Sequence, residues 1–289
     1  MFILSLIARP GTLETALVSS LRNATGGGAA VWLSQGEAAE FPLDHVPSNL
    51  EELRTAVADQ ADLNLLPALG RRKTMLLADM DSTMIQQECI DELAEEAGVG
   101  AHVKEITARA MNGELDFEGA LTERVALLKG LPETVIDRVL ETRISLMPGG
   151  RELVATMKAN GGYAALVSGG FTAFTAKVAR LVGFNENRAN TLLVENGTLT
   201  GEVARPILGR EAKVQALEEI SARLGIPEAD VLAVGDGAND LGMLGRAGMG
   251  VALHAKPSVQ AQCDLRVNHG DLTALLYLQG YGREDFATV

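Results

Sequence analysis

The chain has 289 residues, of which 47% are hydrophobic, and its net charge is −13. This length favours two domains with packed cores. The acidic balance disfavours nucleic acid and anionic membranes as partners, because a phosphate backbone binds to basic stripes. The two cysteines, Cys89 and Cys263, lack the spacing of a zinc site and favour a reducing compartment, so we expect a cytoplasmic protein.

The first part of the chain predicts a small α+β domain. Its expected elements follow the order β-α-β-β-α-β, with strands at 2–8, 30–34, 40–43 and 63–69 and helices at 11–23 and 49–58. Segment 2–8 is apolar but short and lacks a basic leader, so we expect a core strand rather than a signal peptide. The element order resembles that of ACT domains, which are small ligand-binding regulatory modules. We therefore predict an ACT-like domain at residues 1–72.

A second domain is predicted at residues 73–289. Its first strand, 75–78, precedes a helical region with apolar spacings of three and four, and this region gives an expected cap at about 85–147. The expected cap helices are 85–97, 99–111, 117–128 and 132–145, with Asp116 as the N-cap of the third. Helices at 152–159, 174–181, 211–224 and 240–247 then alternate with strands at 163–167, 231–234 and 250–253 and a hairpin at 191–201. This alternation predicts an α/β fold with a parallel sheet.

Asp79 and Asp81 come directly after the apolar strand 75–78. Two carboxylates at the end of a buried strand are costly unless a cation or a substrate compensates their charge. The pattern suits a nucleophilic carboxylate, an acid–base carboxylate and a metal ion in one small volume. A turn that caps a helix would also use aspartates, but the rest of the chain favours the chemical interpretation.

Three further segments accompany the expected strand ends, where open α/β sheets bind ligands. The first places a hydroxyl and unhindered N–H groups before a helix, which suits a phosphate. The second supplies a cation, and the third supplies more carboxylates, whose charge a shared divalent cation would offset. These segments are Ser168-Gly169-Gly170, Lys213 and Gly235-Asp236-Gly237-Ala238-Asn239-Asp240.

The ordered set D-M-D-S-T, S-G-G, lysine and G-D-G-A-N-D resembles the four motifs of the haloacid dehalogenase (HAD) superfamily of phosphotransferases. The match covers residues 74 to about 280. The resemblance implies a Rossmann-like parallel sheet with a helical cap inserted after the first core strand. It also implies that Asp79 attacks phosphorus to form an aspartyl-phosphate, while Asp81 protonates the leaving oxygen and then activates water.

The same resemblance implies how the substrate phosphate and a magnesium ion are held. Mg²⁺ suits hard oxygen ligands, and the implied ligands are Asp79, the main-chain carbonyl of Asp81 and Asp236, with Asp240 beside them. The phosphoryl oxygens would be neutralised by Ser168, the Gly169 N–H group and Lys213, and Asn239 would touch the phosphate or orient Lys213.

The cap narrows the resemblance to the phosphoserine phosphatases of this superfamily. The chain reads D-x-D-S-T-x-x-x-x-E and then M-x-G-x-x-x-F-x-x-x-x-x-x-R. By this resemblance Glu88 binds the ammonium of O-phosphoserine, and Arg124 binds its carboxylate through the guanidinium fork. Met111 and Phe117 would close an apolar wall. The plainer interpretation is that the two charges are solvated and the two apolar side chains belong to a core.

Other functions stay open at this point. Another HAD phosphomonoesterase or a phosphoserine:homoserine phosphotransferase would share the core and differ at the cap. A non-catalytic amino-acid sensor would have no reason to keep all four motif segments. The expected partner is therefore the small molecule O-phosphoserine, without nucleic acid or membrane, and a homodimer stays open.

Overall fold

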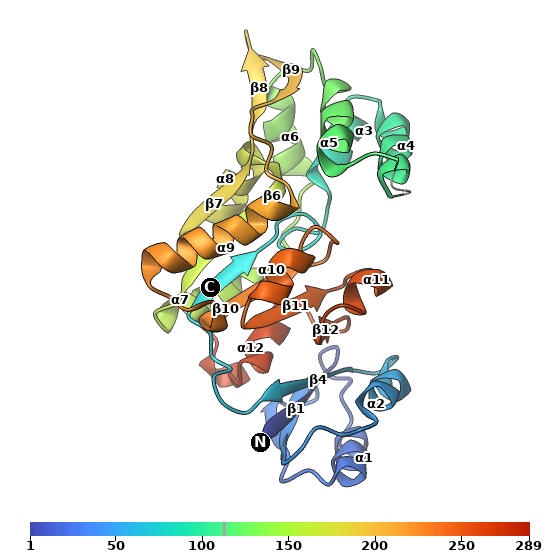
Figure 1. Cartoon of the computed structure of the whole chain (residues 1–289), viewed down its shortest axis with the longest axis vertical. Coiled ribbons are helices and arrows are strands. Elements are labelled where there is room, and N and C mark those ends of the chain that lie inside the picture. Colours follow the sequence, from blue (N-terminus) through green and yellow to red (C-terminus); the bar gives the residue numbers. More distant parts are fainter. Residues whose placement is uncertain (112–113) are drawn as a thin grey trace. The chain divides into compact units, whose positions relative to one another are not determined.

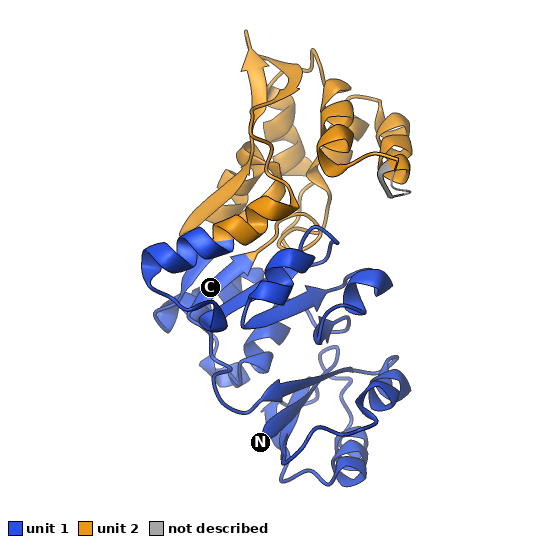
Figure 2. Ribbon diagram, viewed as in Figure 1, with its two compact units in different colours: residues 1–77, 148–164, 217–289 blue, residues 78–147, 165–216 orange. Residues whose placement is uncertain are grey.

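The computed structural model describes residues 1–111 and 114–289, and it divides into two compact units (Figures 1 and 2). Unit 1 comprises residues 1–77, 148–164 and 217–289, and unit 2 comprises residues 78–147 and 165–216. The chain passes between the units four times: within β5 (Met75–Ala78), after residue 147, within β6 (Tyr163–Phe171) and after residue 216. The domain boundary at residue 72 stays a prediction.

Unit 1 begins with a four-stranded antiparallel sheet in the order β2-β3-β1-β4. The elements are β1 (Phe2–Ile7), α1 (Thr15–Thr25), β2 (Val31–Ser34), β3 (Ala38–Leu43), α2 (Leu50–Val57) and β4 (Asp62–Pro67). The predicted order β-α-β-β-α-β is confirmed, and the ACT-like assignment stays a prediction. Helix α2 begins after Asn49, whose side chain makes no capping bond.

Alternation along the strands gives this sheet two different faces. Leu4 and Leu6 of β1 and Phe41 of β3 belong to one apolar cluster with Val18 and Leu21 of α1. The opposite face carries a polar row, because Ser5 pairs in register with Glu40 and Asn64. The two faces therefore differ: one packs on α1 through an apolar cluster, and the other combines this polar row with buried apolar residues such as Ile7 and Leu66.

The polar face is hydrogen-bonded to the C-terminal part of unit 1. Asn64 donates to the carbonyl of Arg266 and accepts from its N–H group, both at 2.9 Å. The carboxylate of Asp62 accepts from the N–H groups of Asn268 and His269 at 2.8 Å. These side chains satisfy backbone groups in and after strand β12 (Leu265–Val267). They therefore connect β12 to β4 through side-chain hydrogen bonds.

The second sheet has six strands in the order β12-β11-β10-β5-β6-β7. Strands β10 (Val231–Gly235), β11 (Met249–Leu253) and β12 run parallel, as do β6 and β7 (Glu186–Asn190). Every residue of β5 and β10 is buried. The predicted α/β class is confirmed, whereas β7 and β12 were not predicted, because one is polar and the other has three residues.

Helices lie between the strands of this sheet along the chain, and the last helix follows its final strand. In chain order they are α7 (Gly150–Ala159), α8 (Thr172–Val182), α9 (Arg210–Leu224), α10 (Leu241–Arg246), α11 (Pro257–Gln260) and α12 (Ala274–Leu278). Every residue of α12 is buried. Short 3₁₀ turns lie at Glu228–Asp230 and Arg283–Asp285.

Unit 2 contains the cap that the sequence predicted after β5. Its helices are α3 (Cys89–Glu96), α4 (Gly100–Met111), α5 (Phe117–Ala126) and α6 (Thr134–Thr142), and β8 (Leu192–Glu195) with β9 (Thr198–Val203) forms the predicted hairpin. Asp116 caps α5 as expected, since its side chain accepts from the N–H group of Gly119. The hairpin lies beside this cap, because Leu199 exchanges backbone hydrogen bonds with Gly130 and Leu131.

The first cap helix begins later than predicted. Residues 85–88 are not helical, because Ile85 forms a bridge with Leu146 and the Gln86 N–H group donates to the carbonyl of Ser145. The chain that enters the cap is thus paired with the chain that leaves it. This pairing uses the backbone groups that a helix would have bonded internally.

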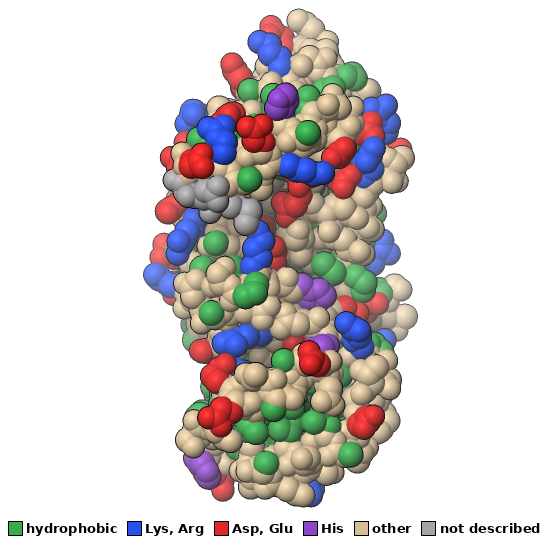
Figure 3. Space-filling model, turned by 90° about the vertical axis from the view of Figure 1, so that its right-hand side faces the viewer, with side chains coloured by type: hydrophobic (Ala, Val, Ile, Leu, Met, Phe, Trp, Pro, Cys, Tyr) green, Lys and Arg blue, Asp and Glu red, His purple; other side chains and the backbone are tan. Residues whose placement is uncertain are grey.

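No helix among the described residues is long and apolar enough to cross a membrane. On the face shown in Figure 3, lysine and arginine side chains are interspersed with acidic ones.

Candidate active site

Asp79 is the first residue after β5, and its buried carboxylate is paired with a buried cation. The Lys213 Nζ atom lies 2.8 Å from Asp79 Oδ1, and the two side chains are only 2% and 8% exposed. The Met80 N–H group also donates to Asp79 Oδ1 at 2.8 Å. A lysine in the first turn of α9 would ordinarily be solvated. The burial of Lys213 against Asp79 therefore favours a chemical role over that of a surface charge.

Asp81 is held by two different parts of unit 2. Its Oδ1 atom accepts from the N–H group of Cys89, the first residue of α3, at 2.8 Å. Its Oδ2 atom accepts from the Ser168 hydroxyl at 3.1 Å, and that hydroxyl accepts from the Gly170 N–H group at 2.8 Å. Both carboxylate oxygens are therefore fixed. Burial, reinforced by the Asp81 carboxylate, raises the pKa of the Cys89 thiol well above its usual range and keeps it protonated.

Gly170 is a functional position that the motif analysis quoted but did not assign. A Cβ atom there would lie 2.5 Å from Asp81 Oδ2 and 3.1 Å from the Ser168 hydroxyl. No side chain fits at that distance, so glycine is required for the carboxylate of Asp81 to reach Ser168.

Phe117 begins α5 and lies against two glycines. A Cβ atom on Gly169 would lie 3.0 Å from the ring, and one on Gly209 would lie 3.2 Å from it. The structure therefore brings the predicted cap residue Phe117 against the predicted phosphate-binding Gly169. The side chain of Met111, which ends α4, lies outside the described side chains, as do residues 112 and 113.

Glu88 and Arg124 lie in one charged environment within the cap. The Ser82 hydroxyl donates to Glu88 Oε1 at 2.6 Å. Burial lowers the pKa of the Arg124 guanidinium, while the nearby carboxylates of Asp91, Glu88 and Asp81 oppose this shift. Burial also raises the pKa of Asp91, against the attraction of Arg124. Asp91 was not predicted, and its position one helical turn after Glu88 was the available signal.

The remaining predicted residues lie in unit 1, in the turn between β10 and α10. Asp236 follows β10 directly, and Asp240, fully buried, precedes α10. Asp240 Oδ2 accepts from the Gly237 N–H group at 2.9 Å, and Asn239 lies in the same turn. The turn therefore holds two carboxylates and an amide at the end of a buried strand, as the sequence predicted.

The donor set fits a hard divalent cation. Among the described residues, Asp79 of unit 2 and Asp236 and Asp240 of unit 1 each offer carboxylate oxygens of the kind that binds a metal ion. Carboxylate oxygens are ligands that Mg²⁺ accepts, whereas a softer metal prefers sulfur or imidazole.

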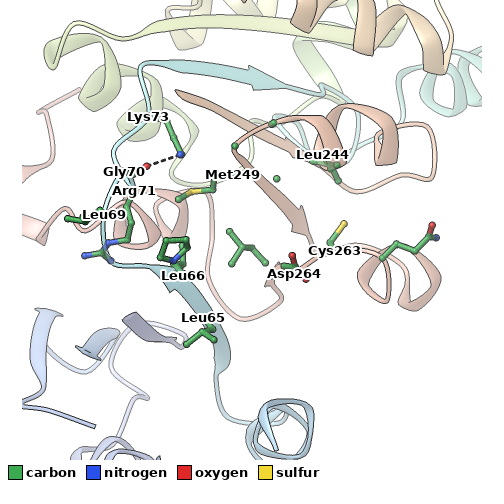
Figure 4. Close-up of a pocket in the computed structure, with 17 residues that line it drawn as sticks. Leu65, Leu66, Leu69, Gly70, Arg71, Lys73, Leu244, Met249, Cys263 and Asp264 are labelled. Atoms are coloured by element: carbon green, nitrogen blue, oxygen red, sulfur yellow. Dashed lines mark hydrogen bonds between the residues drawn. The ribbon is translucent and has the colours of Figure 1, made fainter. Parts of the chain in front are cut away.

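A separate cavity of about 350 Å³ lies within unit 1 (Figure 4). Residues of β4 and of the segment after it line one side, and residues of α10 and β11 line another. Lys73 lies there and donates to the carbonyls of Gly70 and Ala229, both at 2.7 Å. Burial lowers the pKa of the Lys73 ammonium. No predicted site residue lines this cavity.

Comparison with known proteins identifies the family. A family model of haloacid dehalogenase-like hydrolases matches residues 76–245. The chain belongs to this family. The match begins in β5 and ends in α10, so it contains every residue that the sequence analysis assigned to the site.

Individual relatives of this hydrolase cover more of the chain. The phosphoserine phosphatase of Streptomyces coelicolor is 43% identical over 255 residues, which are 86% of this hydrolase and 62% of that protein. The structure of a HAD family hydrolase from Salmonella enterica subsp. enterica serovar Typhi has a TM-score of 0.88 at 30% identity. The alignment covers 96% of this hydrolase and 98% of the Salmonella chain. A phospho-aspartyl intermediate analogue of phosphoserine phosphatase has a TM-score of 0.67 at 41% identity, over 71% and 98% of the two chains.

Proposed function

We propose that this HAD hydrolase is a phosphoserine phosphatase, which hydrolyses O-phosphoserine to serine and phosphate through an aspartyl-phosphate. The observation that carries the proposal is the buried pair of Asp79 and Lys213 beside an Asp81 carboxylate fixed through both oxygens. Relatives named phosphoserine phosphatase, one of them an analogue of a phospho-aspartyl intermediate, support the same reaction. The free thiols of both cysteines agree with a cytoplasmic setting.

Asp79 is the proposed nucleophile. A carboxylate oxygen of Asp79 forms a bond to phosphorus, and the bond from phosphorus to the serine oxygen breaks with its electron pair on that oxygen. The buried Lys213 ammonium stabilises the ionised carboxylate before attack and the phosphoryl oxygens afterwards. Ser168 and the Gly169 N–H group, with Asn239, provide the other polar contacts of the phosphate.

Asp81 is the proposed general acid and base. In the first step it gives a proton to the departing serine oxygen, and in the second it takes a proton from the water that attacks the aspartyl-phosphate. The bonds from Cys89 and Ser168 keep its carboxylate in one place for both steps. One fixed group can therefore serve both half-reactions.

Magnesium is the proposed cofactor. Asp79, Asp236 and the main-chain carbonyl of Asp81 would hold it, and Asp240 would orient this set. When bound, the ion would neutralise charge on the transferring phosphoryl group.

The cap residues give the proposed substrate preference. The charged environment of Glu88 and Arg124 suits a zwitterion. The Glu88 carboxylate would attract the substrate ammonium, and the half-buried Arg124 guanidinium would bind the substrate carboxylate in a bidentate manner. Phe117 and Met111 would supply the apolar wall that excludes water.

The direct test is release of phosphate from O-phosphoserine, with and without Mg²⁺, beside a panel of small phosphate esters and with homoserine as an alternative acceptor. We expect metal-dependent hydrolysis with the highest kcat/KM for O-phosphoserine. Asp79→Asn should abolish turnover while the protein stays folded, because an amide is a poor nucleophile. Equal kcat/KM across the panel would instead indicate a general phosphomonoesterase, and phosphohomoserine as the main product would indicate a phosphotransferase.

A further inference from the structure

Asn190 ties together two segments of unit 2 that the proposed mechanism uses. It ends β7, its side chain is 2% exposed, and it pairs in register with Phe171 of β6. Its Nδ2 atom donates to the carbonyl of Gly169 at 2.9 Å and to that of Leu208 at 3.1 Å. Its Oδ1 atom accepts from the Leu208 N–H group at 2.7 Å. Both ends of the amide are therefore used.

The two tied segments lead to different phosphate ligands. Gly169 follows Ser168 at the end of β6, and Leu208 lies shortly before α9, which carries Lys213 near its start. The two segments belong to different connections of the chain. The Asn190 side chain thus joins the end of β6 that carries Ser168 and Gly169 directly to the backbone that leads to Lys213.

The hydrogen bonds of Asn190 also hold the two backbone segments against which Phe117 lies. Gly169 carries the carbonyl that Asn190 binds, and Gly209 follows Leu208. A Cβ atom added to either glycine would lie 3.0–3.2 Å from the Phe117 ring. The ring therefore lies against two backbone segments that have no side chain at these positions, and the amide of Asn190 is hydrogen-bonded to both segments.

We propose that Asn190 is a positioning residue that sets the spacing between the Ser168–Gly169 segment of β6 and Lys213, and with it the affinity for phosphate. By the same bonds it holds Gly169 and Gly209 as a platform for Phe117 of the cap. The inference rests on the proposed function for the identity of the ligand, which is a phosphoryl group. In this proposal Asn190 takes no part in bond formation or proton transfer.

The first experiment compares Asn190→Ala and Asn190→Asp with a control on the same strand. Asn187→Ala is the control, because Asn187 also accepts one side-chain hydrogen bond, from Thr175 at 2.9 Å, but has no bond to either segment. The probe is inorganic phosphate, measured by calorimetry in the presence of Mg²⁺ and as a competitive inhibitor of hydrolysis. Circular dichroism gives the folded fraction of each variant.

We expect Asn190→Ala to weaken phosphate binding and to lower kcat/KM by about tenfold or more, since displaced catalytic groups cost that much or more in rate. Asn190→Asp should be similarly impaired, because it keeps the acceptor for Leu208 but loses both donors. Asn187→Ala should stay within twofold of the parent. Phosphate affinity within twofold of the parent in folded Asn190→Ala would overturn the inference.

The second experiment tests the platform without altering Asn190. Gly209→Ala should lower kcat/KM for O-phosphoserine at least fivefold in the parent but less than twofold in a Phe117→Leu background, because the smaller side chain leaves room for the new methyl group. Equal costs in both backgrounds would refute the platform. Phosphate binding by calorimetry requires no turnover, so failure of the proposed substrate would be seen separately, as a parent protein that binds phosphate and does not hydrolyse O-phosphoserine.

Discussion

Replacement of Gly170 by alanine tests whether Asp81 is the general acid. The new methyl group would lie 2.5 Å from Asp81 Oδ2, so the carboxylate would have to move by roughly 0.9 Å to reach the ordinary contact distance of 3.4 Å. The carboxylate cannot turn away freely, because its other oxygen is bonded to the Cys89 N–H group. The methyl group would also press on the Ser168 hydroxyl, which accepts from the Gly170 N–H group.

The size of the effect follows from these distances. A catalytic group misplaced by about 1 Å typically costs on the order of 100-fold in rate. Crowding of a packed site costs roughly 1–3 kcal/mol of stability, so the protein should still fold. We therefore expect kcat/KM for O-phosphoserine to fall about 100-fold in Gly170→Ala.

The assay compares two leaving groups. The serine alkoxide needs a proton as it departs, whereas p-nitrophenolate does not, so the first half-reaction with p-nitrophenyl phosphate should lose much less than that with O-phosphoserine. Gly245→Ala is the matched control, because a Cβ atom there meets nothing within 4 Å. An equal loss with both substrates in single-turnover experiments, or a loss below about threefold, would refute the assignment of Asp81.

Three other changes have defined outcomes. Arg124→Lys should lower kcat/KM for O-phosphoserine by about thirtyfold or more while sparing simple aryl phosphates, because lysine keeps the charge but not the fork; steady-state kinetics on both substrates measure this. Cys89 should resist alkylation at pH 8 in the folded protein and react once it is unfolded, since burial raises its thiol pKa, as mass spectrometry would detect. Burial raises the pKa of Tyr277 to about 12, so its hydroxyl contributes stability that is fully present below about pH 10 and is lost as pH rises toward 12. The free energy of unfolding of Tyr277→Phe, measured by chemical denaturation, should therefore fall less steeply than that of the parent across this pH window.

The sequence could suggest candidate site residues because the pattern that marks them is local. Asp79 and Asp81 follow a wholly apolar, buried strand. Two carboxylates at such a position are costly unless a cation or a substrate compensates their charge. The same reasoning identified Ser168 and the turn from Asp236 to Asp240. Lys213 was different, since its own helix gives no sign of burial, and only the motif order pointed to it.

Features that depend on contacts between distant segments were missed. The side chain of Asn190 ends a polar strand that periodicity does not reveal, and its partners lie 18 and 21 residues away in sequence. Gly170 matters because of a carboxylate 89 residues earlier in the chain. Residues 85–88 have a helical pattern, but bridging between Ile85 and Leu146 overrides it. In each case tertiary pairing, rather than local propensity, decides the structure.

The side chains of Asn64 and Asp62 have a consequence for solubility. Strand β12 is the last strand of its sheet, and an open strand of this kind can pair with the same strand of another molecule. Asn64 occupies both backbone groups of Arg266, and Asp62 occupies the N–H groups that follow. Removal of residues 1–72 would bare this row of donors and acceptors. We therefore expect residues 1–72 to prevent this edge from pairing with another molecule.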